Sequence, residues 1–260
     1  MRLVTWNLNS FKARTPRVLE LLDQHAPDVL CLQETKTAAA DFPHELLAAV
    51  GYHAVDHSEG RWNGVAIAVP QDVEVDDVQR GLPHEPAVGE CRWIEATVRG
   101  VRWVSVYVPN GRSPDHEMFQ VKLDFLDAAR DRVRELVAAG PLVVAGDWNI
   151  APTDRDVWDP AMFVGATHVT PDERGRLQAI LGEGLVDAHV AANGPEASAF
   201  TWWDYRMGAL RRGMGMRIDL VLASRDLTVR SSAVDGVYRR NNQAGDKPSD
   251  HAPLIVHLDR

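Results

Sequence analysis

Short apolar runs rich in β-branched residues recur along the whole chain, and turn residues bound each of them. Runs of this length and composition predict β-strands. The run Leu142 to Ala145 has no polar interruption, which is typical of a strand covered on both faces. The predicted strands span residues 3–6, 29–32, 65–69, 93–98, 101–108, 142–145, 218–222 and 253–258.

Helical patterns lie irregularly between these runs. Thr15 and Pro16 predict the N-cap and first turn of one helix, and apolar residues on one helical face predict another over residues 119–137. Arg99 and Gly100 predict the turn of a hairpin. Because strands and helices do not alternate strictly, we expect an α/β fold in which two packed sheets are covered by helices on the outside.

The composition is that of an ordinary globular protein, with 45% hydrophobic and 25% charged residues in 260. We therefore expect a single domain spanning residues 1–260. The longest apolar stretch is interrupted by Gly140 and Pro141, and polar Asn7 comes too early for the core of a signal peptide. Cys31 and Cys91 lack metal-site spacing, so we expect reduced cysteines, a cytoplasmic location and no membrane contact.

The net charge of −9 argues against binding a polyanion through global charge, but the charge is unevenly distributed. Residues 205–218 contain arginines and no acidic residue, and a second basic cluster follows at residues 239–247. A solvated loop is the usual explanation of such a run. Glycines and the methionines Met214 and Met216 lie among the arginines, which favours a mobile surface that contacts a ligand.

Several predicted strands end in polar residues, where a rigid scaffold can fix catalytic groups. Each residue alone has a simpler explanation: Glu34 as a surface residue, Tyr107 as a half-buried strand tyrosine, Asp147 as a turn residue. Asp219 is harder to explain, because it lies between apolar neighbours and needs a partner such as His251. Together these groups supply the oxygen ligands and hydrogen-bond donors of metal-assisted phosphoryl chemistry.

Other catalytic templates are absent from the sequence. It contains no phosphate-binding GxxxxGK[ST] loop, no GxSxG nucleophile elbow and no HExxH zinc motif. No serine or cysteine nucleophile stands beside a base, so water is the expected nucleophile. The donor set also disfavours zinc, because it lacks thiolates and a histidine cluster.

The polar strand ends belong to motifs that follow one another along nearly the whole chain. These are WNLNSFKAR, DVLCLQETK, WNGVAIAV, YVPNGR, GDWNIAPTDRDVW, FTWWDYR, GMRIDLVLAS and SDHAPL. In this order they resemble the endonuclease/exonuclease/phosphatase superfamily, and within it the exonuclease III and AP endonuclease family, bacterial exonuclease III branch. The resemblance implies a four-layered α/β sandwich of the DNase I type, with two packed mixed sheets flanked by helices.

The resemblance also implies roles for individual residues around Mg²⁺ or Mn²⁺. The implied metal-site residues are Asn7, Glu34, Asp147, Asn149, Asp250 and His251. The implied catalytic residues are Tyr107, Asp147, Asn149, Asp219 and His251. Among these, Asp147 matches the residue that orients or deprotonates the attacking water, and Tyr107 matches a neutral hydroxyl donor.

The implied substrate is double-stranded DNA with abasic sites or 3′ ends, bound by a monomer. The implied contacts are Lys36, Asn110, Arg112, Trp202, Arg211, Arg212 and Met216. Met216 stands where the AP endonuclease branch often has tryptophan, and Asn9 where some relatives have aspartate. Cleavage 5′ to abasic sites and 3′-to-5′ trimming of ends both stay open. The alternatives are a phosphodiesterase or phosphatase of the same superfamily acting on another substrate, and a non-catalytic nucleic-acid-binding homologue.

Overall fold

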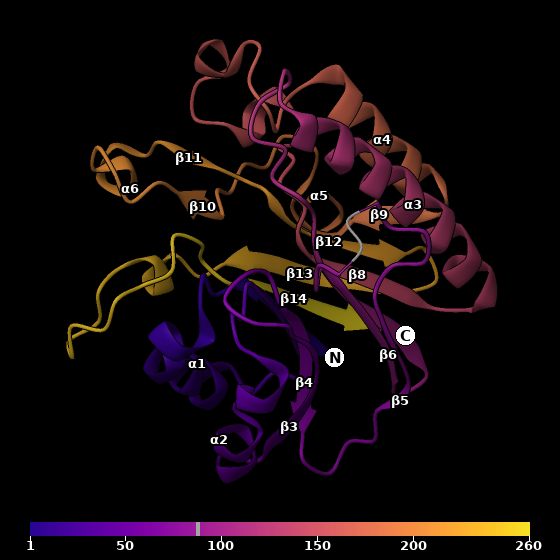
Figure 1. Cartoon of the computed structure of the whole chain (residues 1–260), viewed down its shortest axis with the longest axis vertical. Helices are drawn as coiled ribbons and strands as arrows, with labels where there is room; N and C mark the ends of the chain where they lie inside the picture. Colours follow the sequence, from indigo (N-terminus) through magenta and orange to yellow (C-terminus); the bar gives the residue numbers. More distant parts are fainter. Residues whose placement is uncertain (87–88) are drawn as a thin grey trace.

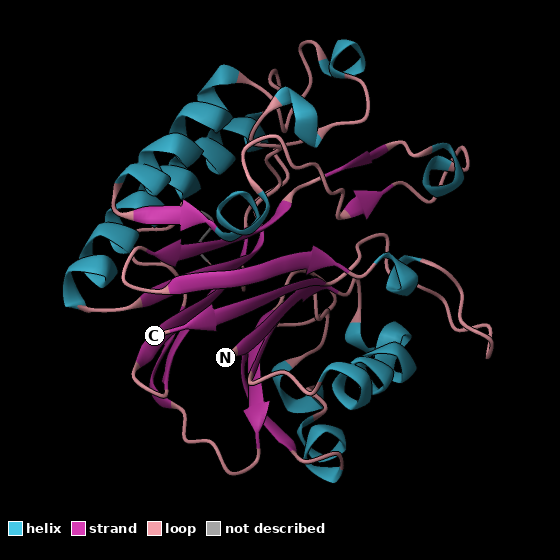
Figure 2. Ribbon diagram, turned by 180° about the vertical axis from the view of Figure 1, so that it is seen from behind, coloured by secondary structure: helices cyan, strands magenta, loops and turns pink. Residues whose placement is uncertain are grey.

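A computed structural model describes residues 1–86 and 89–260 and contains two six-stranded sheets (Figures 1 and 2). The first sheet has the order β13 (Thr228–Val234), β14 (Leu254–Asp259), β1 (Arg2–Asn7), β2 (Val29–Gln33), β4 (Val65–Pro70), β3 (Tyr52–His57). The second has the order β5 (Asp76–Arg80), β6 (Trp93–Val98), β7 (Val101–Tyr107), β8 (Leu142–Asp147), β12 (Asp219–Ser224), β9 (Leu185–Asp187). A separate ribbon pairs β10 (Trp202–Trp203) with β11 (Gly215–Met216).

Both sheets are mixed. β1 and β2 are parallel in the first sheet, β7 and β8 are parallel in the second, and the other pairs are antiparallel. The predicted turn at Arg99 and Gly100 joins β6 to β7 as an antiparallel hairpin. All the strands that the sequence predicted lie inside the sheets, whereas the edge strands β13, β3, β5 and β9 were missed.

Helices α1 (Phe11–His25) and α2 (His44–Ala49) cover the outer face of the first sheet, and α3 (Glu117–Ala139) and α4 (Pro171–Gly182) cover that of the second (Figure 1). The short helix α5 (Ala188–Asn193) packs against β12 and β13, and α6 (Ala209–Arg212) lies in the connection between β10 and β11. Single 3-10 turns occur at Ala39–Asp41, Asp154–Asp156, Pro160–Phe163 and Gly236–Arg239. Within the described ranges, no helix combines the length and the apolar character needed to cross a lipid bilayer.

Three apolar layers hold the sheets and helices together. The central layer packs the inner faces of the two sheets, one outer layer joins α1 and α2 to the first sheet, and the other joins α3 and α4 to the second. In β8, Val143 faces the central layer while Leu142 and Val144 face the helices. This burial on both faces explains the unbroken apolar run, and the predicted four-layered sandwich is confirmed.

The start of α1 differs from the prediction. The helix begins at Phe11, with the hydroxyl of Ser10 accepting a hydrogen bond from the amide of Ala13, so Thr15 and Pro16 lie inside it. Proline removes one intrahelical bond, here to the carbonyl of Lys12, an exposed residue that water can reach. The cost of an internal proline is therefore reduced at this position.

The ends of inner strands from both sheets meet at one edge of the sandwich. Parallel pairing places Asn7 beside Gln33 in the first sheet and Tyr107 beside Asp147 in the second. Antiparallel pairing adds the start of β12, where Asp219 lies opposite Asp147. Residues that are more than a hundred positions apart in the chain are thus brought to one edge by strand register.

Gly146, directly before Asp147, allows β7 and β8 to approach closely. Its φ is +154°, and a Cβ atom built there would lie 1.9 Å from the carbonyl oxygen of Val106. No side chain fits at this distance, so glycine is required by the neighbouring backbone as well as by its own dihedral angle.

We predict that Gly146→Ala lowers the free energy of unfolding by about 2 kcal/mol or more, because the strands must separate to admit the methyl group. Gly140→Ala is the matched control: its φ is +151°, but nothing lies within 4 Å of the added Cβ. Chemical denaturation of both variants measures the difference. Equal losses would show that the close approach at Val106 has no energetic consequence.

A buried ion pair fixes the loops that follow β7 and β8. Lys122 on α3 and Glu173 on α4 are paired, and both side chains are fully buried. The ammonium group also donates to the carbonyl oxygen of Asn149 at 2.7 Å and to that of Asn110 at 3.3 Å. Burial lowers the pKa of Lys122, while Glu173 opposes this shift. One cation therefore holds two backbone segments that carry predicted site residues.

We predict that Lys122→Met destabilises the fold by about 3 to 5 kcal/mol, because Glu173 is left buried without its partner. The control is Arg134→Met, which removes a partner of Glu183 from a pair on the exposed surface of α3. Such a pair contributes about 1 kcal/mol or less. Urea denaturation compares the two, and a Lys122→Met loss as small as that of Arg134→Met would contradict the assignment.

Candidate active site

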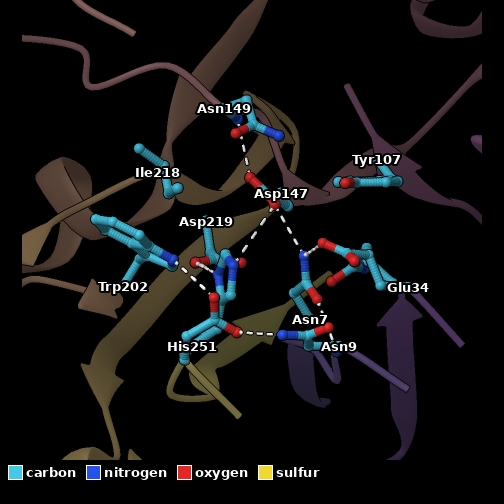
Figure 3. A network of polar contacts seen from close by, with 12 residues as sticks. Asn7, Asn9, Glu34, Tyr107, Asp147, Asn149, Trp202, Ile218, Asp219 and His251 are labelled. Atoms are coloured by element: carbon cyan, nitrogen blue, oxygen red, sulfur yellow. Dashed lines mark hydrogen bonds and ion pairs between the residues drawn. The ribbon is translucent and has the colours of Figure 1, made fainter. Parts of the chain in front are cut away.

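A cluster of carboxylates and amides lies where the two sheets meet (Figure 3). The side-chain amide of Asn7, at the end of β1, donates to Glu34 Oε1 and to Asp147 Oδ2, each at 2.9 Å. Asn7 and Asp147 are buried, whereas Glu34 is partly exposed. The amide thus holds one carboxylate from each sheet at a fixed separation, with Glu34 open to the solvent side.

His251 and Asp219 form a second pair beside this cluster. Nδ1 of His251 lies 2.8 Å from Asp219 Oδ2, and Nε2 lies 3.8 Å from Asp147 Oδ2. Burial opposes a charge on the imidazole, but Asp219 and the further carboxylates Asp147 and Asp250 outweigh it and raise the pKa of His251 to about 10. The imidazole is therefore protonated at neutral pH and can donate a hydrogen bond from Nε2.

Asp147 is the most perturbed carboxylate of the cluster. Burial, together with the negative charges of Asp219 and Glu34, raises its pKa to about 7, although His251 and Asn7 act in the opposite direction. A carboxylate with a pKa near neutrality can accept a proton at physiological pH. Strong perturbation by burial and neighbouring charge is typical of catalytic groups.

Tyr107 and Asn149 border the cluster on the side of the second sheet (Figure 3). Burial raises the pKa of Tyr107 well above 10, and the charge of Glu34 adds to the shift, so the hydroxyl stays protonated and can donate. Asn149 has a left-handed backbone with φ of 52° and donates its amide N–H to Asp147 Oδ1 at 2.9 Å. This conformation turns the chain back over the end of β8.

The donor set fits a divalent cation. Ligand atoms of Glu34, Asp147 and His251 lie within 4.8 Å of one another. Asp219 Oδ1 is buried without a hydrogen-bond partner, which leaves negative charge in the cluster that one imidazolium does not neutralise. Carboxylate oxygens in an octahedral or flexible site suit Mg²⁺ and Mn²⁺. Glu34 and Asp147 are the residues best placed to hold such an ion.

Asp250 lies at the side of the cluster. Its Oδ1 accepts a hydrogen bond from the side-chain amide of Asn9 at 3.0 Å, and its Oδ2 accepts one from the indole of Trp202 at 3.1 Å. Burial disfavours its charge, but His251 and these two donors prevail and lower its pKa. Both oxygens are engaged within the protein, so its role as a metal ligand remains a prediction.

Residues predicted to contact the substrate surround the cluster at different distances. Lys36 bridges Glu34, at 2.7 Å, and Asn9, at 2.6 Å. Asn110 donates to the side-chain oxygen of Asn149 at 3.2 Å, and Arg112 is exposed nearby in a left-handed conformation. These three predicted contacts therefore lie beside the catalytic candidates.

The remaining predicted contacts belong to the β10–β11 ribbon and its connecting helix. Trp202 is partly exposed, whereas Met216 pairs with it across the ribbon and is only 4% exposed. Met216 packs in a small apolar cluster, so the ribbon offers Trp202 rather than Met216 to a ligand. Arg211 and Arg212 are exposed on α6, at the far end of the ribbon from the cluster (Figure 1).

Other residues of the site were not predicted from the sequence. The hydroxyl of Thr201 accepts the amide N–H groups of Ile218 and Asp219, each at 3.1 Å, and so fixes the start of β12. The hydroxyl of Ser249 donates to the carbonyl oxygen of Asn7 at 2.7 Å. Both stand next to predicted residues in the motifs FTWWDYR and SDHAPL, which is the one signal that marks them.

His168 is a third unpredicted neighbour, and no motif identifies it. Its Nδ1 lies 2.5 Å from the carbonyl oxygen of Asn149. Burial and the adjacent charge of Lys122 lower its pKa to about 4, so the ring is neutral at pH 7 and Nδ1–H donates. His168 and Lys122 thus share one carbonyl acceptor.

Comparison with known proteins agrees with this geometry. The model of the Endonuclease/Exonuclease/phosphatase family matches residues 4–251. Exodeoxyribonuclease III of Haemophilus influenzae is 31% identical, over 98% of both chains. Two solved structures align over the full length of both chains. A variant of the 3′ phosphatase NExo from Neisseria, bound to a product DNA hairpin, is 36% identical with a TM-score of 0.94, and an AP endonuclease from Archaeoglobus fulgidus is 34% identical with a TM-score of 0.93.

The match includes Asn7, Glu34, Asp147 and Asp219, and it ends at His251. The predicted family and fold are therefore confirmed by sequence and by structure. The chain belongs to the Endonuclease/Exonuclease/phosphatase family.

Proposed function

We propose that this protein is a divalent-metal-dependent DNA repair nuclease that hydrolyses phosphodiesters at abasic sites, on their 5′ side, and at 3′ ends. The observation that carries the proposal is the convergence of Glu34, Asp147 and His251 within 4.8 Å at one sheet edge. The relatives support the substrate, because their names include an exodeoxyribonuclease, a 3′ phosphatase and an AP endonuclease. The shared chemistry is attack of water on a phosphoester of DNA.

Each residue has a physical task in this reaction. Asp147, with a pKa near 7, orients the water and accepts its proton. The imidazolium of His251, held by Asp219, donates from Nε2 to a phosphate oxygen, and Asn149 and the neutral hydroxyl of Tyr107 offer further donors. Preorganised donors of this kind stabilise the charge that gathers on phosphate oxygens in the transition state. A bound Mg²⁺ or Mn²⁺ would supply additional charge neutralisation at Glu34 and Asp147.

The distribution of ion pairs supports an anionic macromolecular substrate. The basic residues of α3 and α4 all pair with carboxylates. Beside the cluster Lys36 pairs with Glu34, but several other basic residues that border the cluster and the ribbon have, in the described part of the chain, no carboxylate partner within 4 Å. They are Lys12, Arg14, Arg61, Arg112, Arg211, Arg212, Arg239 and Lys247. Cations left unpaired on one face can bind phosphates despite the net charge of −9.

The finer assignments are part of the same proposal. We propose a monomer whose single domain spans residues 1–260, and a cytoplasmic location consistent with the buried free thiols of Cys31 and Cys91. The preferred DNA carries an abasic site or a blocked 3′ end. An exposed abasic nucleotide leaves the stack at least cost, and Trp202 provides a flat wall beside the cluster.

We predict that the purified protein nicks a duplex with one abasic site and removes a 3′ phosphate from a nicked duplex, in Mg²⁺ or Mn²⁺ but not in EDTA. Asp147→Asn should lower both rates by about 100-fold or more, because it removes the proton acceptor. Asp23→Asn, an exposed change on α1, is the control. Undiminished cleavage in EDTA or in Asp147→Asn would refute the mechanism. Hydrolysis of a phosphoinositide with DNA left intact would assign the chain to another substrate.

We also predict that Asp147→Asn raises the melting temperature in EDTA at pH 8 by a few degrees. The folded pKa of Asp147 is about 7 and the unfolded value is about 4, so the folded state loses stability as the pH rises between these values. The gain should therefore shrink at pH 5, where the carboxyl is already protonated. Calorimetry on Asp147→Asn and Asp23→Asn measures both melting temperatures. An increase in melting temperature that is equally large at pH 5 would exclude removal of a buried negative charge as its cause.

Binding of a divalent cation should stabilise the unsubstituted protein and should stabilise Asp147→Asn much less. The physical reason is that the cation favours the ionised carboxylate that burial disfavours. A melting temperature that does not respond to Mg²⁺ or Mn²⁺ in the unsubstituted protein would count against the metal site.

A further inference from the structure

A basic pocket lies between α6 and the segment before Asp250. Its volume is about 610 Å³. The basic residues that line it are Arg14, Arg211, Arg239 and Lys247. Asp204 is the acidic residue among its lining residues, and its Oδ1 accepts the amide N–H of Arg206. The pocket therefore carries a net positive charge in a chain whose net charge is −9.

Arg239 is a buried cation without a carboxylate partner among the described residues. It is 5% exposed, and its Nη2 donates to the carbonyl oxygens of Trp203, at 2.9 Å, and Asp204, at 3.3 Å. Its Nε has no hydrogen-bond partner, and its guanidinium lies 4.9 Å from the centre of the Tyr205 ring. Carbonyl groups and an aromatic ring orient this cation but do not neutralise it, so an anion in the pocket would compensate a charge that the fold leaves buried.

Arg14 connects the pocket to the catalytic side. Its Nη2 donates to the hydroxyl of Tyr205 at 2.6 Å and to the carbonyl oxygen of Pro248 at 3.1 Å, and its Nη1 donates to that of Asn9 at 3.0 Å. Asn9 in turn binds Asp250. A single arginine thus spans from the pocket wall to the catalytic cluster.

The ribbon strand β10 separates the pocket from the cluster. Trp203 donates its amide N–H to the carbonyl oxygen of Asp250 at 3.0 Å, and Trp202 forms a bridge with His251. The chain continues directly from this strand into Asp204 and Tyr205, which line the pocket. The pocket and the catalytic cluster therefore lie on the two sides of one short strand.

We propose that this pocket binds a non-scissile phosphate of the DNA strand whose phosphodiester is hydrolysed at the catalytic cluster. The proposal rests on the proposed nuclease function and adds a subsite to it. Arg211 and Lys247 contact the phosphate from the exposed rim of the pocket. The buried guanidinium of Arg239 attracts it electrostatically. The Tyr205 ring, Leu210 and Pro248 offer apolar surface to the adjoining sugar.

The test is binding of a DNA hairpin in which one phosphate at a time is replaced by a neutral methylphosphonate. Arg211→Gln and Lys247→Gln are suitable because both side chains are exposed. Each is combined with Asp147→Asn, so that binding is measured without cleavage. Arg225→Gln, an exposed arginine in the turn after β12, is the matched control.

We expect each pocket variant to reduce the slope of log affinity against log salt by about 1, as loss of one phosphate contact does. For the protein that carries only Asp147→Asn, a methylphosphonate at one particular position should lower the binding affinity. The pocket variants should show no loss of affinity at that position, although their affinity should still fall with a methylphosphonate at other contacted positions. Arg225→Gln should retain every response. With Asp147 intact, Arg211→Gln and Lys247→Gln should raise KM and leave kcat unchanged.

Failure of the subsite and failure of the function are distinguishable. If DNA is cleaved but the pocket variants bind every methylphosphonate hairpin as the Arg225→Gln control does, the subsite is wrong and the nuclease stands. If the protein binds no DNA at all, the subsite is also wrong. If it binds DNA with the predicted coupling but hydrolyses none, the pocket stands as a phosphate site and the catalytic proposal falls.

Discussion

The crowding of Asp147 and Asp219 at one sheet edge is the constraint on which the site depends. Strand register places them opposite each other, both are buried, and His251 is the cation that lies between them. Burial and excess negative charge raise the pKa of Asp147, and the neighbouring carboxylates keep His251 protonated although burial opposes its charge. The same imbalance would favour a divalent cation, so the proposed proton acceptor, the proposed proton donor and the proposed metal site share one electrostatic cause.

The surrounding backbone is shaped to keep these groups in place. Gly146 lets β8 lie against β7 so that Asp147 emerges beside Tyr107, and Asn149 then turns the chain in a left-handed conformation. The buried ammonium group of Lys122 donates a hydrogen bond to the carbonyl oxygen of Asn149. A left-handed non-glycine residue is costly unless its surroundings fix it, and here a buried cation does so. The second sheet and its helices thus position Asp147 and Asn149, while Asn7 of the first sheet holds Asp147 and Glu34.

The sequence predicts the inner strands but not the edges, for a physical reason. Inner strands such as β8 are buried on both faces and read as unbroken apolar runs, whereas β5 and β13 are largely exposed and contain polar residues at most positions. The catalytic candidates could be found because they lie at the ends of those inner strands, within recognisable motifs. The pairing of Lys122 with Glu173 could not, since it joins two helices through tertiary packing and leaves no local pattern.

Basic side chains have different partners on α3 and α4 from those around the cluster and the β10–β11 ribbon. On α3 and α4 the basic side chains are paired with carboxylates of the same protein. This pairing cancels most of their positive potential, so they attract an anionic ligand only weakly. Around the cluster and the ribbon, cations such as Arg14 and Arg239 bind carbonyl oxygens and aromatic rings instead, which orients them without cancelling their charge. In this acidic protein these cations therefore retain positive charge beside the cluster in which Asp147 and His251 meet.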